Sequence, residues 1–241
     1  MLIFLVPPTL NAQFPKDYTG RPFHDDSVRI FPAHLPGILQ CEYYDLGGEG
    51  VAYGGTKARV NGLNVGSDFN RSMGCNEGGA QYLCRFRDTE AVAVSYTKPC
   101  CDIDSVKNMF PQSLGQIYTG WTPPGQWMKY TVFVDTPGVY TIHFVYTAPM
   151  PEGLEFSLAL NNRMIVDKAR VPNSCHSDQK DGLRWHRWNK ALNIAEITFP
   201  TKGLQLLTFT ATYPDANEKN DLGNFDYIEF VRKGSVPGSH Q

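Results

Sequence analysis

The chain has 241 residues and a formal net charge of −2, with 41% hydrophobic and 19% charged residues. This length suits a single β domain, because β-sandwiches often reach roughly 200–250 residues as one unit. The near-neutral charge argues against a nucleic-acid partner, since phosphate binding requires clustered Lys and Arg. The 12 Tyr, 14 Phe and 4 Trp favour strands, and flat rings are also the surfaces on which sugars stack.

Residues 1–12 resemble the remnant of a secretory signal. The segment contains a short apolar run and ends at the small residue Ala12, although no basic region precedes the run. The run is too short to span a bilayer, which takes about 20 residues. We therefore expect a secreted, extracellular or cell-surface protein without a membrane span. The alternative is that this segment forms an apolar strand at the domain edge.

The next residues divide into a lead-in, a domain and a tail. Residues 13–34 are rich in Pro, Asp and His without an apolar period, which predicts an extended lead-in. Residues 35–233 are predicted to form one β-sandwich, and 234–241 a flexible tail. The first strand is expected at 38–44, before the glycine-rich break at 47–50. Within 57–117 we expect a long loop insertion, because this part lacks strand periodicity.

Two β-hairpins are predicted after the insertion. The first joins strands at 127–134 and 139–146 through a Pro-Gly turn, and Tyr140, Ile142, Phe144 and Tyr146 lie on one face of the second strand. The second pairs 155–160 with 164–166 through Asn161-Asn162, since adjacent asparagines tolerate the left-handed conformation of tight turns. Further strands are predicted at 192–199, 205–213 and 225–231. This pattern predicts an all-β fold, a β-sandwich of jelly-roll type.

Six cysteines could be oxidised in an exported chain; they are Cys41, Cys75, Cys84, Cys100, Cys101 and Cys175. We expect at least one disulfide to hold the long loop, formed by Cys75 or Cys84 with Cys100 or Cys101. The alternative is that the cysteines are free, buried thiols. No paired CxxC or His motif predicts structural zinc.

Five ordered sequence blocks together resemble a family 6 carbohydrate-binding module. They extend from about residue 35 to residue 230 and comprise 40–45, 45–53, 120–132, 171–173 continued by 185–188, and 222–230. The second half of the fourth block reads Trp185-His186-Arg187-Trp188, and the last block reads Leu222-Gly223-Asn224-Phe225-Asp226-Tyr227-Ile228-Glu229-Phe230.

The resemblance implies a loop-built cleft in which a sugar ring lies between two aromatic side chains while an Asn binds its hydroxyls. On the matching positions, Trp185 is the expected aromatic platform and Asn224 the expected polar contact. The second wall is expected at Phe86, or at Tyr82 in its place. The alternatives are core packing for Trp185 and a turn position for Asn224, and Trp188 is expected in the core.

The resemblance also implies a structural calcium ion that joins the first and last strands. Its ligands would be Gln40, Glu42 and Asp226, together with backbone carbonyls, because Ca²⁺ prefers several hard oxygen ligands. Gln40 supplies a neutral amide where the family has a carboxylate, so a weaker site is expected. The alternative is that the two acids are solvated carboxylates at the edge of a sheet.

We expect a module without catalytic activity that binds a polysaccharide or oligosaccharide, alone or with a catalytic domain in a larger assembly. The sequence has no GxSxG, HExxH, P-loop or GxGxxG motif. One alternative is a β-sandwich glycoside hydrolase or polysaccharide lyase that works in the same cleft. The other is a surface adhesion or assembly domain that binds protein.

Overall fold

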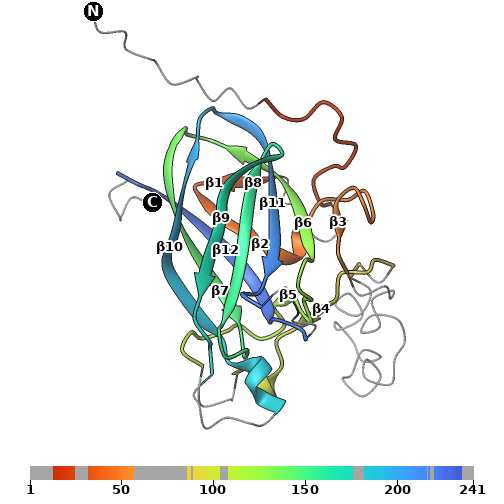
Figure 1. Ribbon diagram of the computed structural model, residues 1–241, viewed down its shortest axis with the longest axis vertical. Coiled ribbons are helices and arrows are strands. Elements are labelled where there is room, and N and C mark those ends of the chain that lie inside the picture. The colour runs from red at the N-terminus through yellow and green to blue at the C-terminus, as the bar shows by residue number, and fades with distance from the viewer. Residues whose placement is uncertain are drawn as a thin grey trace, which may run out of the picture.

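Two β-sheets pack face to face in the computed structural model, which describes residues 13–24, 32–56, 86–87, 89–103, 108–175, 182–215, 217 and 220–234 (Figure 1). The fold is all-β, a β-sandwich of jelly-roll type, as the sequence predicts. The proposed signal remnant, Tyr82, Cys75 and Cys84 lie outside the described residues.

The first sheet has six strands in the order β1-β6-β11-β8-β9, with β3 paired to β6. Its strands are β1 (Ala33–Leu35), β3 (Tyr53–Gly54), β6 (Trp127–Val134), β8 (Leu154–Leu160), β9 (Arg163–Val171) and β11 (Gly203–Thr212). Strand β1 runs parallel to β6, whereas the other pairings in this sheet are antiparallel. The end of the predicted lead-in therefore belongs to the sheet.

The second sheet has the order β10-β7-β12-β5-β4, with β2 paired to β12. Its strands are β2 (Gly37–Gln40), β4 (Val94–Tyr96), β5 (Ile117–Thr119), β7 (Gly138–Thr147), β10 (Asn189–Phe199) and β12 (Asn224–Arg232). Strand β12 lies between β7 and β2, so the last strand of the chain contacts one of the first. This pairing brings the two ends of the sequence resemblance together.

Alternating side chains of both sheets fill the core. Tyr140, Ile142, Phe144 and Tyr146 of β7 are fully buried, as their period of two predicts. The rings of Phe144 and Phe209 pack edge to face across the sandwich, 5.9 Å between centroids. The predicted hairpin of β8 and β9 is confirmed, although β9 continues beyond its predicted end to Val171. The predicted hairpin of 127–134 with 139–146 is wrong, because β6 and β7 belong to different sheets and the turn between them crosses from one sheet to the other.

Two sequence expectations need correction. The predicted strand at 38–44 ends at Gln40, and the 3-10 turn η1 (Cys41–Tyr43) follows it. The segment 57–117 is not all loop, since its described part contributes β4, β5 and the π-helical turn η3 (Pro99–Ile103). Within the described segments the helical elements are short turns, and none has the length and apolar character needed to cross a bilayer.

Candidate functional site

Trp185 lies on the short 3-10 turn η4 (Gly182–His186), between β9 and β10 at one end of the sandwich (Figure 1). Its side chain is half-buried, so it is neither in the core nor fully exposed. The Arg184 guanidinium is 5.5 Å from the centroid of the Trp185 ring, a cation–π distance. Trp188, three residues later, is fully buried, as predicted.

Asn224, the first residue of β12, lies next to this turn. Its Nδ2 donates a hydrogen bond of 2.7 Å to the backbone carbonyl of Trp185. Its Oδ1 accepts one of 3.3 Å from the backbone N–H of Trp121. The structure therefore brings Trp185 and Asn224 together from positions 39 residues apart.

Trp121 is the residue that the sequence analysis missed. It lies between β5 and β6, is half-buried, and adopts a left-handed backbone with φ 48°. That conformation is rare for a bulky residue and is found mainly where function or packing requires it. The signal was present in the block Gly120-Trp121-Thr122-Pro123-Pro124-Gly125-Gln126-Trp127, but only tertiary contacts connect its second residue to Trp185.

The carboxamide of Asn224 thus joins the backbones of two half-buried tryptophans. Asn224 is only 3% exposed and both of its polar atoms bind backbone, so it mainly holds the two tryptophans in place. The face of an indole packs well against the C–H groups of a pyranose, and two such rings from different loops could contact one sugar unit. The backbones of Trp185 and Trp121 therefore lie near each other, with Asn224 as the connecting group.

Phe86 does not belong to this site. It is 3% exposed and packs in a separate apolar cluster with Phe23, Val94 and Ile117. Its ring lies 5.4 Å from that of Phe23 and 6.0 Å from that of Tyr43, between centroids. Because its side chain is enclosed, Phe86 cannot form a wall of an open cleft. Tyr82, the other predicted wall, lies outside the described residues.

The predicted calcium ligands Glu42 and Asp226 lie close together and are buried, 2% and 1% exposed. Burial raises the pKa of Asp226 to about 7. Burial, and then the charge of Asp226, raises the pKa of Glu42 well above its usual value. The alternative of solvated edge carboxylates is therefore wrong, because both side chains are enclosed. Two buried acids next to each other also resist ionising together.

The oxygen atoms at this place fit a hard cation. Glu42 Oε2, Asp226 Oδ2 and Gln40 Oε1 are all buried without a hydrogen-bond partner. Gln116 of the inserted segment donates from Nε2 to the other oxygen of Asp226 at 2.5 Å. Among the described residues no cluster of three or more His, Cys, Asp and Glu side chains could hold a metal, so any ion here would depend on amide and backbone oxygens as well as two carboxylates.

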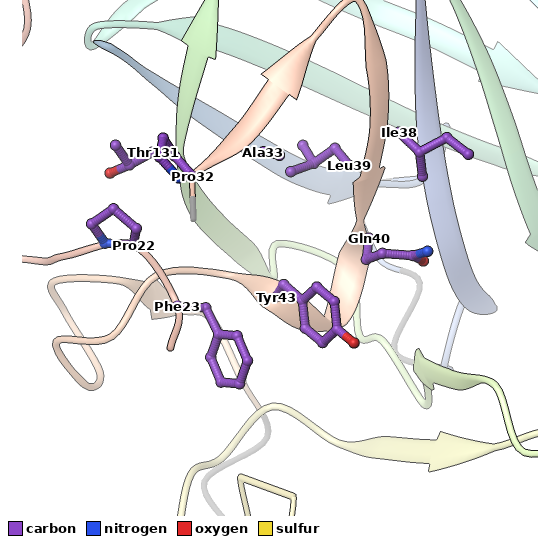
Figure 2. A pocket seen from close by; sticks show the side chains of 9 residues that line it. All are labelled: Pro22, Phe23, Pro32, Ala33, Ile38, Leu39, Gln40, Tyr43 and Thr131. Atoms are coloured by element: carbon purple, nitrogen blue, oxygen red, sulfur yellow. The ribbon is translucent and has the colours of Figure 1, made fainter. Parts of the chain in front are cut away.

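A separate apolar cavity of about 160 Å³ lies beside β2 and η1 (Figure 2). The lead-in residues Pro22 and Phe23 form one wall, and Ile38, Leu39 and Tyr43 form another. The Phe23 and Tyr43 rings are stacked on each other, 5.1 Å between centroids. Trp185, Trp121 and Asn224 do not line this cavity, so it is distinct from the candidate cleft.

The described cysteines occupy different environments. Cys101 of η3 is disulfide-bonded, and its partner is not among the described side chains. Cys41 carries a buried free thiol. The predicted pairings of Cys101 with Cys75 or Cys84 therefore lie outside the described residues.

No family model and no curated protein matches the sequence. The fold is similar to a β-1,3-glucan-binding family 6 module from Bacillus halodurans, with 14% identity, a TM-score of 0.46, and coverage of 83% of this chain and 98% of that one. A family 35 carbohydrate-binding module from Clostridium thermocellum matches with 16% identity and a TM-score of 0.38 over 57% of this chain and 86% of its own. The C-terminal family 6 module of LamC from Zobellia galactanivorans has 18% identity and a TM-score of 0.36, over 49% and 82% of the two chains.

Proposed function

We propose that this chain binds carbohydrate without catalysis, and that a sugar unit of a polysaccharide or oligosaccharide stacks on Trp185 and Trp121. The supporting observation is the Asn224 carboxamide, which donates to the Trp185 carbonyl and accepts from the Trp121 N–H. These bonds hold the backbones of two half-buried tryptophans from separate loops close to one side chain. The sequence resemblance to family 6 modules supports the same function.

The choice of binding over catalysis rests on the chemistry beside the two indoles. The only carboxylate hydrogen-bonded to η4 in the described residues is Asp102, which is fully buried. A glycoside hydrolase needs two carboxyl groups facing the scissile bond, which this arrangement does not offer within the described part of the chain. Stacking on aromatic rings with few polar contacts gives dissociation constants of roughly micromolar to millimolar, about −8 to −4 kcal/mol.

A glycan array followed by calorimetry tests this proposal. Wild type should retain at least one polysaccharide or oligosaccharide, and Trp185→Ala should lose that binding while its melting temperature stays close to wild type. Phe133→Ala is the matched control, because Phe133 is a half-buried aromatic near the far end of β6. It should bind as wild type does.

Other results would select the alternatives. New reducing ends or unsaturated products on incubation with the bound glycan would indicate a hydrolase or lyase. Silence on a broad array, together with specific capture of one protein, would indicate an adhesion or assembly domain. Equal binding by wild type and Trp185→Ala would place the sugar elsewhere on the molecule.

We also propose that Glu42, Asp226 and Gln40 hold a structural calcium ion and that the protein is exported. The ion would neutralise two buried acids and connect η1 with β12, so it would stabilise the sandwich without taking part in chemistry. Export fits the disulfide at Cys101, since such bonds persist in oxidising compartments. Calorimetric titration of the chelated protein with Ca²⁺ tests the first proposal, and secretion of the full-length gene product tests the second.

A further inference from the structure

Asp102 is a fully buried carboxylate in the inserted part of the chain. It belongs to the π-helical turn η3 and is 0% exposed. A buried charge must be fully hydrogen-bonded, because its loss of hydration is otherwise very unfavourable. The groups that bind Asp102 therefore show what this carboxylate holds in place.

Three donors from two segments converge on the carboxylate. The backbone N–H of Lys98 donates to Oδ2 at 2.9 Å, which fixes Asp102 within its own turn. On Oδ1, Trp188 donates from Nε1 at 2.8 Å, and His186 Nδ1 lies at 2.9 Å. Because an ionised carboxylate only accepts, the Nδ1 atom of His186 carries the proton in this pair. His186 is the last residue of the turn that carries Trp185, and Trp188 follows it by two residues.

Backbone contacts extend the same connection. Met109 and Phe110 donate through their N–H groups to the Trp188 carbonyl, at 2.9 and 3.1 Å. Asn108 accepts from the Trp188 N–H at 3.1 Å and donates to the Asp102 carbonyl. Asp102 and residues 108–110 of the insertion therefore hold the segment 186–188 at several points, and Asp102 supplies the only carboxylate among these described contacts.

We propose that Asp102 is the positioning residue of the carbohydrate site: its carboxylate binds His186 and Trp188 and so fixes Trp185 beside Trp121. This inference rests on the proposed function, since Trp185 is the platform there. A five-residue 3-10 turn has too few internal hydrogen bonds to define its own position. Asn224 binds the Trp185 carbonyl in the same turn, so the turn is held by both a buried carboxylate and a buried carboxamide.

The test uses two substitutions that change hydrogen bonding at this carboxylate. Asp102→Asn replaces one acceptor oxygen by an amide donor, so it cannot satisfy both Lys98 and the His186–Trp188 pair. Trp188→Phe keeps an aromatic ring against Tyr118 but removes the Nε1 donor. Asp135→Asn is the matched control, because Asp135 forms an equally short 2.9 Å pair with His34 on the surface.

Two measurements are made on each variant: glycan affinity, and acrylamide quenching of Trp185 fluorescence, taken as the difference from the same variant carrying Trp185→Phe. We expect Asp102→Asn and Trp188→Phe to weaken glycan binding at least tenfold and to raise the quenching of Trp185, with Asp135→Asn unchanged. If Asp102→Asn fails to fold, Trp188→Phe decides the question by itself.

The inference is overturned if folded Trp188→Phe and Asp102→Asn keep wild-type quenching of Trp185, whatever their affinities. It is also overturned if quenching rises while affinity stays at the wild-type value, because the position of Trp185 would then not matter for binding. If wild type binds no glycan at all, the proposed function fails, and the quenching data still show whether Asp102 positions Trp185.

Discussion

Trp121 shows how a single residue can reveal a site through its backbone. A left-handed φ costs on the order of 1–3 kcal/mol for a bulky side chain, so surrounding contacts must stabilise it. Here the Trp121 N–H binds Asn224 Oδ1, and the neighbouring Thr122 N–H lies 3.4 Å from the Gly223 carbonyl. Gly120 is needed because a Cβ there would lie 2.9 Å from Asn224 Oδ1.

Trp121→Ala should weaken glycan binding by about tenfold, or about 1.4 kcal/mol, because one of two stacking faces is lost. The free energy of unfolding should also fall, because Ala keeps the Cβ that strains the left-handed backbone while the contacts of the half-buried ring with the cluster of Tyr118, Val145 and Trp188 are lost. Isothermal calorimetry with the glycan that wild type binds checks the affinity, and urea unfolding checks the stability. Trp121→Tyr, which keeps a flat ring, should retain most of the affinity. Unchanged binding by Trp121→Ala would exclude Trp121 as a wall.

Phe86 is predicted to matter for stability and not for binding. Phe86→Ala removes an enclosed ring from the cluster with Phe23, Val94 and Ile117. The free energy of unfolding should fall by about 3–5 kcal/mol, as for other buried phenylalanines. Urea unfolding measures this loss, and calorimetry on the folded fraction should give wild-type affinity. A stable Phe86→Ala variant that no longer binds glycan would restore Phe86 as a site residue.

At the scale of elements, local sequence signals were sufficient where local forces decide. Asn161 and Asn162 adopt φ of 49° and 65°, as the predicted tight turn requires. The alternation in β7 likewise placed its buried face correctly. Both features depend on neighbouring residues alone, and for that reason they can be predicted without knowledge of the rest of the fold.

The end of β2 depended on distant residues and was predicted wrongly. A strand would place Cys41 and Glu42 on opposite faces, yet both are 2% exposed. The turn η1 allows both side chains to point inward, with Glu42 beside Asp226 at the other end of the sequence. The sequence 38–44 has good strand character, so only the buried carboxylate pair distinguishes the turn from a strand.

Gln40→Glu should strengthen calcium binding, since a third carboxylate adds charge to the proposed ligand set. We expect at least a tenfold lower dissociation constant for Ca²⁺ by calorimetric titration. In chelator the same variant should be less stable than wild type, because a third buried acid joins two others. Gln116→Glu, which also faces Asp226, is a useful comparison. If Gln40→Glu left calcium affinity unchanged, Gln40 would not be a ligand.

At the scale of the whole molecule, the site depends on contacts that no sequence period encodes. Asn224 and Trp121 are 103 residues apart, and Asp102 and Trp188 are 86 apart. The family resemblance predicted Trp185 and Asn224 because they lie in matching blocks. It could not identify Asp102, which lies in the insertion, or the burial of Phe86, which depends on the lead-in residue Phe23. The contacts of Asp102 and the burial of Phe86 both depend on long-range packing, which no local sequence pattern encodes.

The buried acids predict how the stability of the whole domain depends on pH. The pKa of Asp226 is about 7 in the folded protein, against about 3.9 for an exposed Asp. Between these values the unfolded chain has released a proton that the folded chain keeps, so the unfolding free energy of the chelated protein falls as pH rises. The fall should begin near pH 4 and end near pH 7. Glu42, whose pKa is also raised, acts in the same direction.

Urea unfolding at pH 4.5 and pH 7.5, in chelator and in excess Ca²⁺, measures this dependence. In chelator the wild-type protein should lose more stability across this interval than Asp226→Asn, by a few kcal/mol, because about 1.4 kcal/mol accompanies each unit of pKa shift. Comparison with the variant cancels the contributions of other carboxyl groups. Calcium, which binds the ionised carboxylates, should remove most of the loss at pH 7.5. If the unfolding free energy of wild type and of Asp226→Asn depends equally on pH in chelator, Asp226 ionises normally. If the pH dependence of wild type is the same in chelator and in Ca²⁺, the paired acids do not bind calcium.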